Sequence, residues 1–176
     1  MSEDWVQVLK EKMQREVSAL KKRGIEVREA REGDELVYRI ETQSVVKQLR
    51  KEVREKLLSV FKLSPAEFKF RTVKGVEMGV LIARGVMTEA DKEKLILLQK
   101  QYGDGFQWNY NEKSKTLRVV IVLNEFYRRG IEELVNKVNN QLAEASALLV
   151  TMGAVLDYKI GVGKEIEVRI RLLAGS

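Results

Sequence analysis

The 176-residue chain carries an internal repeat, and this repeat limits the architecture more than any local pattern does. Residues 24–61 match residues 105–142 at a constant offset of 81, and the match continues to the end of both copies after a shift of seven residues. The matched pairs include Gly24 with Gly105, Leu36 with Leu117, Ile40 with Ile121, Gly75 with Gly163, Val80 with Val168 and Ile82 with Ile170. Because copies of one segment adopt the same local fold, the sequence predicts one order of elements twice.

Each copy has the hydrophobic periodicity of helix, strand, strand, helix, strand and strand. Three- and four-residue spacing of apolar residues predicts the helices, and alternation of apolar and charged residues predicts the hairpins. In the first copy the predicted helices span residues 4–23 and 44–61, and the predicted strands span residues 25–31, 35–41, 68–73 and 76–83. A single capped turn is expected at residues 64–67, where serine caps and proline fits the first position.

The second copy follows the same order. Its predicted helices span residues 88–102 and 124–152, and its predicted strands span residues 106–111, 117–123, 154–160 and 165–173. The strand at 117–123 is apolar on both faces, which is typical of a strand covered above and below. We therefore expect it at the centre of a sheet with both of its faces packed.

The repeat predicts an α+β fold, in which an α-β-β-α-β-β unit is duplicated in tandem. We expect antiparallel sheets with helices packed on one face and a pseudo-twofold arrangement. Residues 1–86 form the first repeat and residues 87–174 the second, and the two are expected to pack as one globular unit because no Pro/Ser-rich linker separates them. Gly175 and Ser176 are interpreted as a remnant of cloning and lie outside the repeat.

The composition excludes several chemistries. Cysteine and histidine are both absent, which removes disulfides, thiolate nucleophiles, histidine bases and the usual zinc ligands. The neighbouring carboxylates Glu132 and Glu133 point about 100° apart on a helix, so they do not easily share one site. We therefore expect a protein that is not an enzyme, with no catalytic residue, metal site or cofactor.

No segment has the length and apolarity of a membrane span. The longest apolar region, residues 145–156, is interrupted by Thr151 and Gly153 and is too short to cross a bilayer. The first residues are polar and acidic, unlike a secretory signal. We expect a cytoplasmic protein without membrane association, and its lysine- and glutamate-rich composition favours a thermophilic source, although the single proline argues against one.

The net charge of +6 is concentrated in the first copy, where residues 1–87 hold 19 Lys/Arg against 14 Asp/Glu. Five cations give the helix predicted at 44–61 a basic outward face: Lys47, Arg50, Lys51, Arg54 and Lys56. Of these, Lys47, Arg50, Lys51 and Arg54 are the candidate contacts to an anion or a nucleic acid. Such a face can follow a phosphate backbone. It can equally be a solvated surface on which Lys51 pairs with Glu55 and Glu52 with Lys56 at four-residue spacing.

A second group of cations lies near the start of the helix predicted at 124–152. Arg128 and Arg129 occupy its first turns, where cations oppose the helix dipole. They either point into solvent or converge with free N–H groups on an anion.

An aromatic row lies on the strand predicted at 106–111. Phe106, Trp108 and Tyr110 share one face, and rows of this kind can stack nucleic-acid bases. The repeat equivalents of Phe106 and Trp108 are Ile25 and Val27, which cannot stack bases. The equivalence favours packing in the core.

The strand predicted at 76–83 carries one charge and no proline over most of its length. As an exposed edge it would present unpaired backbone groups to another chain. Its candidate interface residues are Val76, Met78, Val80 and Ile82. Internal pairing between the two halves of the chain is the alternative.

These patterns favour a non-enzymatic protein-binding or assembly factor, an accessory to a larger filament or complex. The second hypothesis is a nucleic-acid-binding protein that uses the basic helix face from Lys47 to Lys56. Protein partners are expected first, nucleic acid or a further copy of the chain second.

Overall fold

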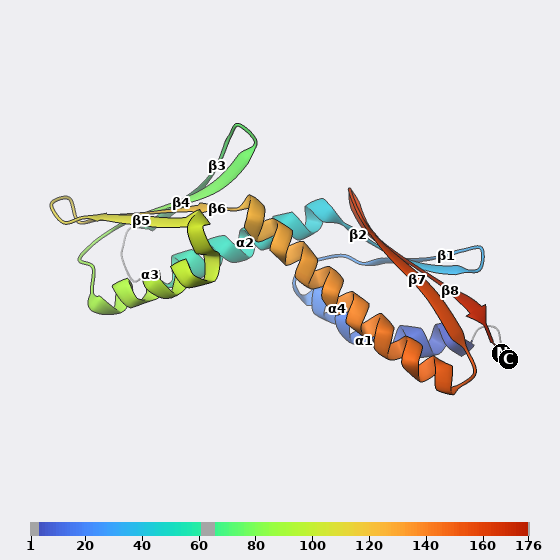
Figure 1. Ribbon diagram of the computed structural model, residues 1–176. Coiled ribbons are helices and arrows are strands. Elements are labelled where there is room, and N and C mark those ends of the chain that lie inside the picture. The colour runs from blue at the N-terminus through green and yellow to red at the C-terminus, as the bar shows by residue number, and fades with distance from the viewer. Residues whose placement is uncertain (1–3, 61–65, 176) are drawn as a thin grey trace. The chain divides into compact units, whose positions relative to one another are not determined.

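The computed structural model describes residues 4–60 and 66–175, and it contains the predicted element order in both repeats (Figure 1). The first repeat comprises α1 (Asp4–Lys22), β1 (Arg28–Glu32), β2 (Glu35–Glu41), α2 (Thr42–Val60), β3 (Ala66–Val73) and β4 (Val76–Arg84). The second comprises α3 (Glu89–Tyr102), the short 3₁₀ helix η1 (Gly103–Gly105), β5 (Phe106–Asn111), β6 (Thr116–Val122), α4 (Asn124–Thr151), β7 (Val155–Val162) and β8 (Glu165–Ala174). The predicted turn at 64–67 is only partly testable, because Ser64 and Pro65 lie outside the described residues. Ala66 and Glu67 belong to β3.

Local sequence explains where several elements begin and end. Thr88 caps α3, since its hydroxyl accepts a hydrogen bond from the Asp91 N–H while the Asp91 carboxylate accepts one from the Thr88 N–H. This capping box satisfies two backbone donors that have no partner inside the helix. Gly24 follows α1 with a φ of 85°, a left-handed conformation that glycine adopts without steric cost.

The chain forms two compact units. Unit 1 consists of Met1–Gln48 and Ile131–Ser176, and unit 2 consists of Leu49–Gly130. The unit boundaries fall inside α2 and α4, whereas the boundary between the repeats falls at residues 86 and 87. Each unit therefore combines parts of both repeats.

Strand pairing explains why the units cut across the repeats. The sheet of unit 1 has the order β1-β2-β8-β7, and the sheet of unit 2 has the order β3-β4-β6-β5. Each sheet contains one hairpin from each repeat, joined at its centre by β2 with β8 or by β4 with β6. When every strand is replaced by its equivalent in the other repeat, β1-β2-β8-β7 becomes β5-β6-β4-β3, which is the order of the second sheet read in reverse. This is a twofold relation in topology.

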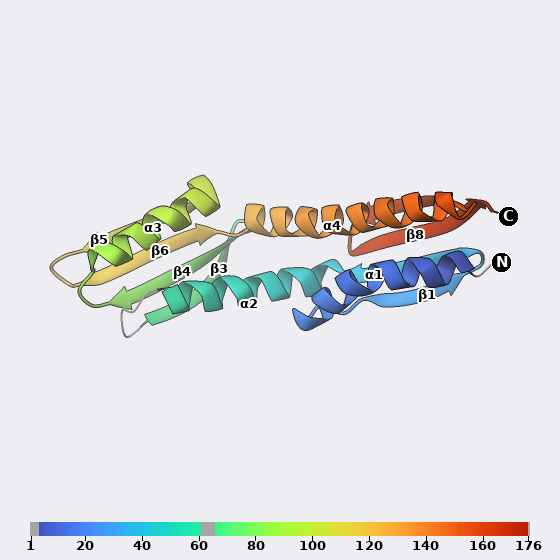
Figure 2. The same cartoon turned by 90° about the horizontal axis from the view of Figure 1, so that it is seen from below.

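All strand pairs are antiparallel, and in each unit the helices lie on one face of the sheet, as Figures 1 and 2 show. In unit 1 the helix-covered face of β2 and β8 carries Leu36, Ile40, Ile166 and Ile170, which are at most 3% exposed. The α+β fold with helices on one face of antiparallel sheets is thereby confirmed.

In unit 2 the helix-covered face is built around β4 and β6. Leu81, Leu117, Val119 and Ile121 are completely buried, and Phe106 on β5 is buried beside Ile121. Burial of apolar surface contributes about 25 cal/mol per Å², so this layer is the main source of stability in the unit.

The predicted alignment of the repeats is wrong in its last part. It equates Val80 with Val168 and Ile82 with Ile170, but these residues lie on opposite faces of their sheets. Val168 and Ile170 face the helices, opposite Tyr38 and Leu36, whereas Val80 and Ile82 alternate with the fully buried Leu81 and face away. Because side chains alternate along a strand, an error of one residue reverses the face of every side chain.

The strand predicted at 117–123 is central, as expected, because β6 pairs with β4 on one side and β5 on the other. The expectation that both of its faces are packed is wrong. Val120 and Val122 point away from the helices of unit 2 and are half-buried, and no described helix of unit 2 lies on that face (Figures 1 and 2). Within unit 2, the second apolar face of β6 is therefore left without a covering layer.

Gly79 is the residue of β4 that permits close packing of the aromatic side chain on β3. A methyl group at Gly79 would lie 2.5 Å from Phe68 Cζ and 3.1 Å from Ile121 Cγ2. Phe68 is itself held edge-to-face against Phe70, with ring centroids 5.0 Å apart. The ring has little room to withdraw.

We predict that Gly79→Ala lowers the free energy of unfolding by about 1–3 kcal/mol, the usual cost of overpacking a core. The measurement is urea unfolding followed by circular dichroism. Gly161→Ala is the matched control, because Gly161 is also a strand glycine and no atom would lie within 4 Å of its new methyl group. Equal stabilities of the two variants would contradict the packing at Gly79.

Candidate binding face

The uncovered side of the unit 2 sheet is the candidate functional site, and we call it the open face. Its apolar centre consists of Met78, Val80 and Ile82 on β4 with Val120 and Val122 on β6. Its charged margin consists of Lys69 and Arg71 on β3, Arg84 on β4, Arg118 on β6 and the carboxylate of Glu67 on β3. Gln107 and Asn109 on β5 extend it as uncharged polar residues.

The apolar centre is continuous across the two middle strands. Met78 lies opposite Val122 and Val80 opposite Val120 in the β4–β6 register. Val80 is 8% exposed because it lies between these neighbours, whereas Ile82 is 38% exposed at the end of the row. Opposed side chains on neighbouring strands lie about 5 Å apart, so the five residues form one contiguous patch.

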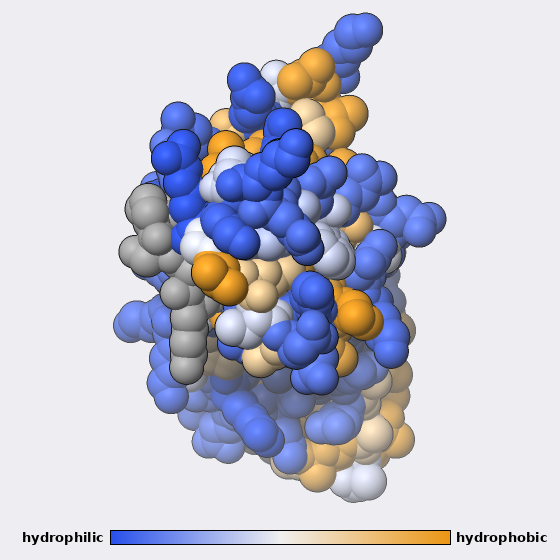
Figure 3. Space-filling view, turned by 90° about the vertical axis from the view of Figure 1, so that its left-hand side faces the viewer, coloured by the Kyte–Doolittle hydropathy of each residue, from blue (hydrophilic) through white to orange (hydrophobic). Residues whose placement is uncertain are grey.

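The hydrophobic row continues to the tip of the β3–β4 hairpin. Val73 and Val76 flank the turn and are 51% and 40% exposed. Figure 3 views unit 2 from the end where the β5–β6 turn lies, and hydrophobic residues lie among hydrophilic ones on this side. Exposed apolar patches bordered by polar residues are typical of interaction sites.

The cations of the open face have few partners of opposite charge. Lys69 Nζ lies 3.0 Å from Glu67 Oε1, in an exposed pair that contributes little to stability. Within the described part of the chain, no ion pair joins Arg71, Arg84 or Arg118 to a carboxylate. The open face therefore carries uncompensated positive charge around an apolar centre.

The corresponding side of the unit 1 sheet, which we call the ion-pair face, has the opposite character. Its described charged residues are five cations and six carboxylates: Arg28, Arg39, Lys159, Arg169 and Arg171 with Glu32, Glu35, Glu41, Asp157, Glu165 and Glu167. Val37 lies on this face and is completely buried. The charged side chains thus cover the apolar atoms and neutralise one another.

Arg39 and Arg169 are the centres of the ion-pair face. Arg39 lies 2.6 Å from Glu32 and 3.1 Å from Glu167, and Arg169 lies 2.6 Å from Glu167. Hydrogen bonds from Arg169 and then Arg39 lower the pKa of Glu167, and hydrogen bonds to Glu32 and Glu167 raise the pKa of Arg39. These shifts indicate a network that already satisfies its own charges.

The basic helix face predicted on 44–61 is only partly present. Lys47, Lys51 and Arg54 are exposed on α2, and no ion pair joins Lys51 to Glu55 among the described residues. Lys56 Nζ donates to Gln101 Oε1 at 2.8 Å. Arg50 does not belong to this exposed group, because it forms an ion pair with Glu77 on β4.

Arg50 and Glu77 form a two-point ion pair between α2 and β4. Arg50 Nε and Nη2 lie 2.7 and 3.0 Å from the two oxygens of Glu77, and the Tyr127 hydroxyl donates to Glu77 Oε1 at 3.0 Å. The hydrogen bond from Arg50 is the main cause of the lowered pKa of Glu77, and burial raises the pKa of Tyr127 to about 12. Arg50 is therefore a structural residue and not a free anion contact.

Arg128 and Arg129 do not converge on an external anion site. Arg128 Nε donates to Glu125 Oε2 at 2.9 Å, and Arg129 Nε lies 3.6 Å from Glu125 Oε1. A carboxylate of the same helix turn thus takes the place that an anion would occupy. The side chain of Asn124 accepts the Glu77 N–H at 2.7 Å and joins the start of α4 to β4.

The aromatic row at 106–111 faces the helices, as the core interpretation predicted. Phe106 is completely buried, and Trp108 lies beside the buried Val119. The Tyr110 hydroxyl donates to the Gly85 carbonyl at 2.7 Å. No aromatic residue lies on the open face among the described strand residues.

The edge-strand prediction for β4 is wrong, because β4 pairs with β3 on one side and with β6 on the other. The alternative prediction, internal pairing between the two halves of the chain, is confirmed by the pairing of β4 with β6. The four residues of that prediction, Val76, Met78, Val80 and Ile82, nevertheless form the outward row of β4 and lie on the open face. The predicted hairpin already places Lys69 and Arg71 beside β4. Periodicity does not place Arg118 of β6 beside Ile82, because that position depends on pairing between the repeats.

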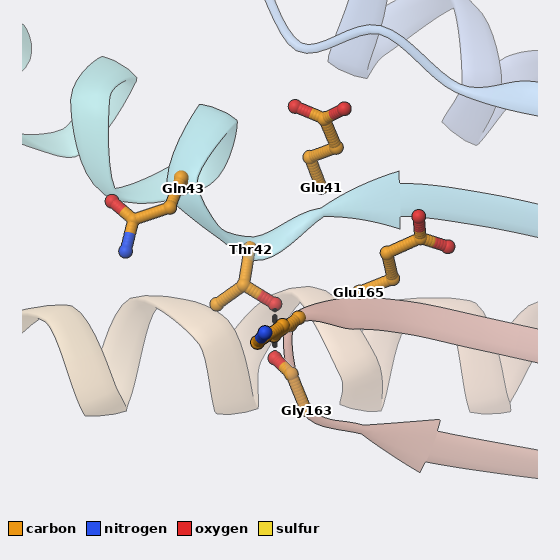
Figure 4. Close-up of a pocket in the computed structure, with 6 residues that line it drawn as sticks. Glu41, Thr42, Gln43, Gly163 and Glu165 are labelled. Carbon is orange, nitrogen blue, oxygen red and sulfur yellow. Dashed lines mark hydrogen bonds between the residues drawn. The ribbon is translucent and has the colours of Figure 1, made fainter.

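A hollow of about 570 Å³ lies where the β7–β8 turn meets the junction of β2 and α2 (Figure 4). The Thr42 hydroxyl donates to the Gly163 carbonyl at 2.6 Å, and the Thr42 N–H donates to the Lys164 carbonyl at 3.0 Å. The carboxylates of Glu41 and Glu165 point away from this link and both lie near Arg28. The hollow is therefore lined in part by the hydrogen bonds that join Thr42 to the β7–β8 turn.

Two further searches of the described residues bear on function. No group of three or more acidic side chains there is arranged to hold a metal ion. None of the described helices has the length and apolarity to cross a membrane. Comparisons with protein-family models, with curated proteins and with solved structures find no significant match to the chain.

We predict that Glu77→Gln lowers the free energy of unfolding by about 1–2 kcal/mol at pH 7, because it removes the charge from a partly exposed ion pair. The lowered pKa of Glu77 means that the native state holds the carboxylate more strongly than the unfolded state does. Its stabilisation is therefore complete above the ordinary value of 4.5 and is lost as the pH falls through the lowered pKa. The measurement is chemical unfolding of both proteins from roughly pH 3 to pH 7.

Glu125→Gln is the matched control, because Glu125 also pairs with arginine but does so in solvent. We expect a smaller loss from it than from Glu77→Gln. A difference between wild type and Glu77→Gln that stays constant over the whole pH range would contradict the assigned ion pair.

Proposed function

We propose that this chain is a non-enzymatic protein-binding or assembly factor that acts in the cytoplasm and engages its partner through the open face. The observation that carries the proposal is the difference between the two sheets. In unit 1, charged side chains that neutralise one another cover the outer residue Val37. In unit 2, no described element of the unit covers the five apolar residues of the open face. A partner would bury the apolar centre of the open face.

The apolar composition of β6 supports this reading. A strand whose two faces are both apolar is typical of a sheet packed on both sides, and the described residues of unit 2 supply a layer on one side only. A partner that supplied this layer would bury Val120 and Val122 and would extend the packing around Val80. The energy of such interfaces is concentrated in a few central residues.

The composition of the open face favours protein over nucleic acid. Sheets that bind single-stranded nucleic acid combine cations with aromatic side chains that stack on bases. The aromatic residues of β3 and β5 face the helices instead. Aliphatic residues at the centre suit aliphatic side chains of another protein.

We predict that Ile82→Thr/Val122→Thr lowers partner capture about tenfold, since each tenfold change requires only about 1.4 kcal/mol at a binding hot spot. Threonine keeps the β-branched shape that suits a strand, so the sheet is retained. The measurement is capture from native lysate by the tagged full-length chain, with and without nuclease, quantified by mass spectrometry.

The control is Val162→Thr, an exposed strand residue of unit 1 that lies away from the open face. We expect it to capture the same proteins as wild type. Equal capture by all three chains, or capture that disappears on nuclease treatment, would contradict the proposal.

Nucleic-acid binding is the second candidate, because Lys51 and Arg54 remain exposed on α2. The protein-binding proposal predicts no mobility shift of DNA or RNA at about 50 mM salt, where phosphate contacts are strong. A shift that weakens steeply with salt and disappears in Lys51→Glu/Arg54→Glu would replace it with the nucleic-acid function.

A further inference from the structure

We propose that the partner of the open face is an acidic amphipathic helix, with an aliphatic stripe bordered by aspartate and glutamate side chains. This inference rests on the proposed function and names the chemistry of the partner. It is carried by the position of each cation relative to the apolar row.

Three residues of the outward row of β4, Met78, Val80 and Ile82, each lie opposite a cation in the sheet. Arg71 lies opposite Met78 and Lys69 opposite Val80 in the β3–β4 register. Arg118 lies opposite Ile82 in the β4–β6 register. Arg84 follows Ile82 by two residues and closes the end of the row. The cations thus form a border along one side and one end of the apolar centre.

Among the described residues, no ion pair joins three of these cations, Arg71, Arg84 and Arg118, to a carboxylate. Glu67 is the one carboxylate among the described strand residues of the open face, and it pairs with Lys69. The ion-pair face of unit 1 provides the comparison, because there each of the four arginines lies within 4.0 Å of a carboxylate. Two sheets of the same topology thus differ in whether their charges are internally balanced. Complementary carboxylates on a partner would balance the open face.

The spacing of the row suits a helix. Side chains two residues apart on one face of a strand are about 6.7 Å apart, so Met78, Val80 and Ile82 span about 13 Å. Successive apolar residues on one helix stripe rise about 5–6 Å, so three of them cover a similar distance. A helix docked here would give the sheet a layer on its second face, like the helices that cover its first face.

The test uses synthetic peptides of about 18 residues, or five helical turns, titrated with the full-length chain by fluorescence anisotropy. All carry leucine at positions i, i+3/i+4 and i+7, and they differ only in having glutamate, glutamine or lysine at the bordering positions. We expect the glutamate peptide to bind at least about tenfold more tightly than the lysine peptide, with the preference shrinking as salt shortens the screening length below about 10 Å.

Arg71→Glu/Arg118→Glu should abolish or reverse the preference for the glutamate peptide, because the two positions border the apolar row. Lys159→Glu is the matched control, since Lys159 is an exposed cation on the outer side of the other sheet. We expect the control to keep the preference of wild type. Circular dichroism checks that the three chains have the same secondary structure.

The outcomes separate this inference from the proposed function. Equal binding of the three peptides that is lost in Ile82→Thr/Val122→Thr would overturn the acidic partner while leaving protein binding at the open face intact. Failure of the glutamate peptide to bind would also overturn it. Two other results would overturn the acidic partner, because another occupant would then fill the open face. One is self-association that depends on Ile82, measured by light scattering. The other is RNA binding that depends on Arg71 and Arg118.

Discussion

Backbone hydrogen bonding between strands of different repeats is the constraint on which this fold depends. Each repeat contributes two hairpins, and an isolated two-stranded hairpin is marginally stable in water. Pairing of β2 with β8 and of β4 with β6 turns four hairpins into two four-stranded sheets. The buried layer around Leu81, Val119 and Ile121 exists only because β4 and β6, from different copies, lie side by side. Each compact unit therefore needs both repeats.

The same pairing decides which side chains become neighbours on the outer sides of the sheets, and there the two copies have diverged. In unit 1 the neighbours are opposite charges, so arginines and glutamates cover Val37 and neutralise one another. In unit 2 the neighbours are valine, methionine and isoleucine with cations along the border. The two sheets of the duplicated scaffold thus differ on their outer sides. The ion-pair face neutralises its own charges, whereas the open face, among the described residues, keeps exposed apolar residues and unpaired cations, and this supports the proposal of a partner.

Much of the local structure could be predicted from the sequence, because hydrophobic period and capping residues are local signals. The helices and hairpins lie close to their predicted ranges. The central position of β6 in its sheet also agrees with the prediction. The exchange of hairpins could not be predicted, since periodicity does not specify which strands pair. For the same reason the ion pair of Arg39 with Glu167, 128 residues apart, had no signal in the sequence. The apolar residues on both faces of 76–83 and 117–123 are a sequence signal for the open face. The same pattern also fits an edge strand or a strand covered on both faces, so it does not identify the open face by itself.

The most direct measurement is methyl NMR of the full-length chain, free and with the glutamate peptide. In the free protein, contacts between the methyl groups of Val80 and Val120 would establish that β4 and β6 pair across the repeats. On addition of the peptide, we predict shift changes at Ile82, Val120 and Val122 and none at Val37 in the other sheet. Absence of the Val80–Val120 contact would contradict the exchanged pairing and, with it, the open face. Shift changes centred on Val37 would contradict the binding role of the open face.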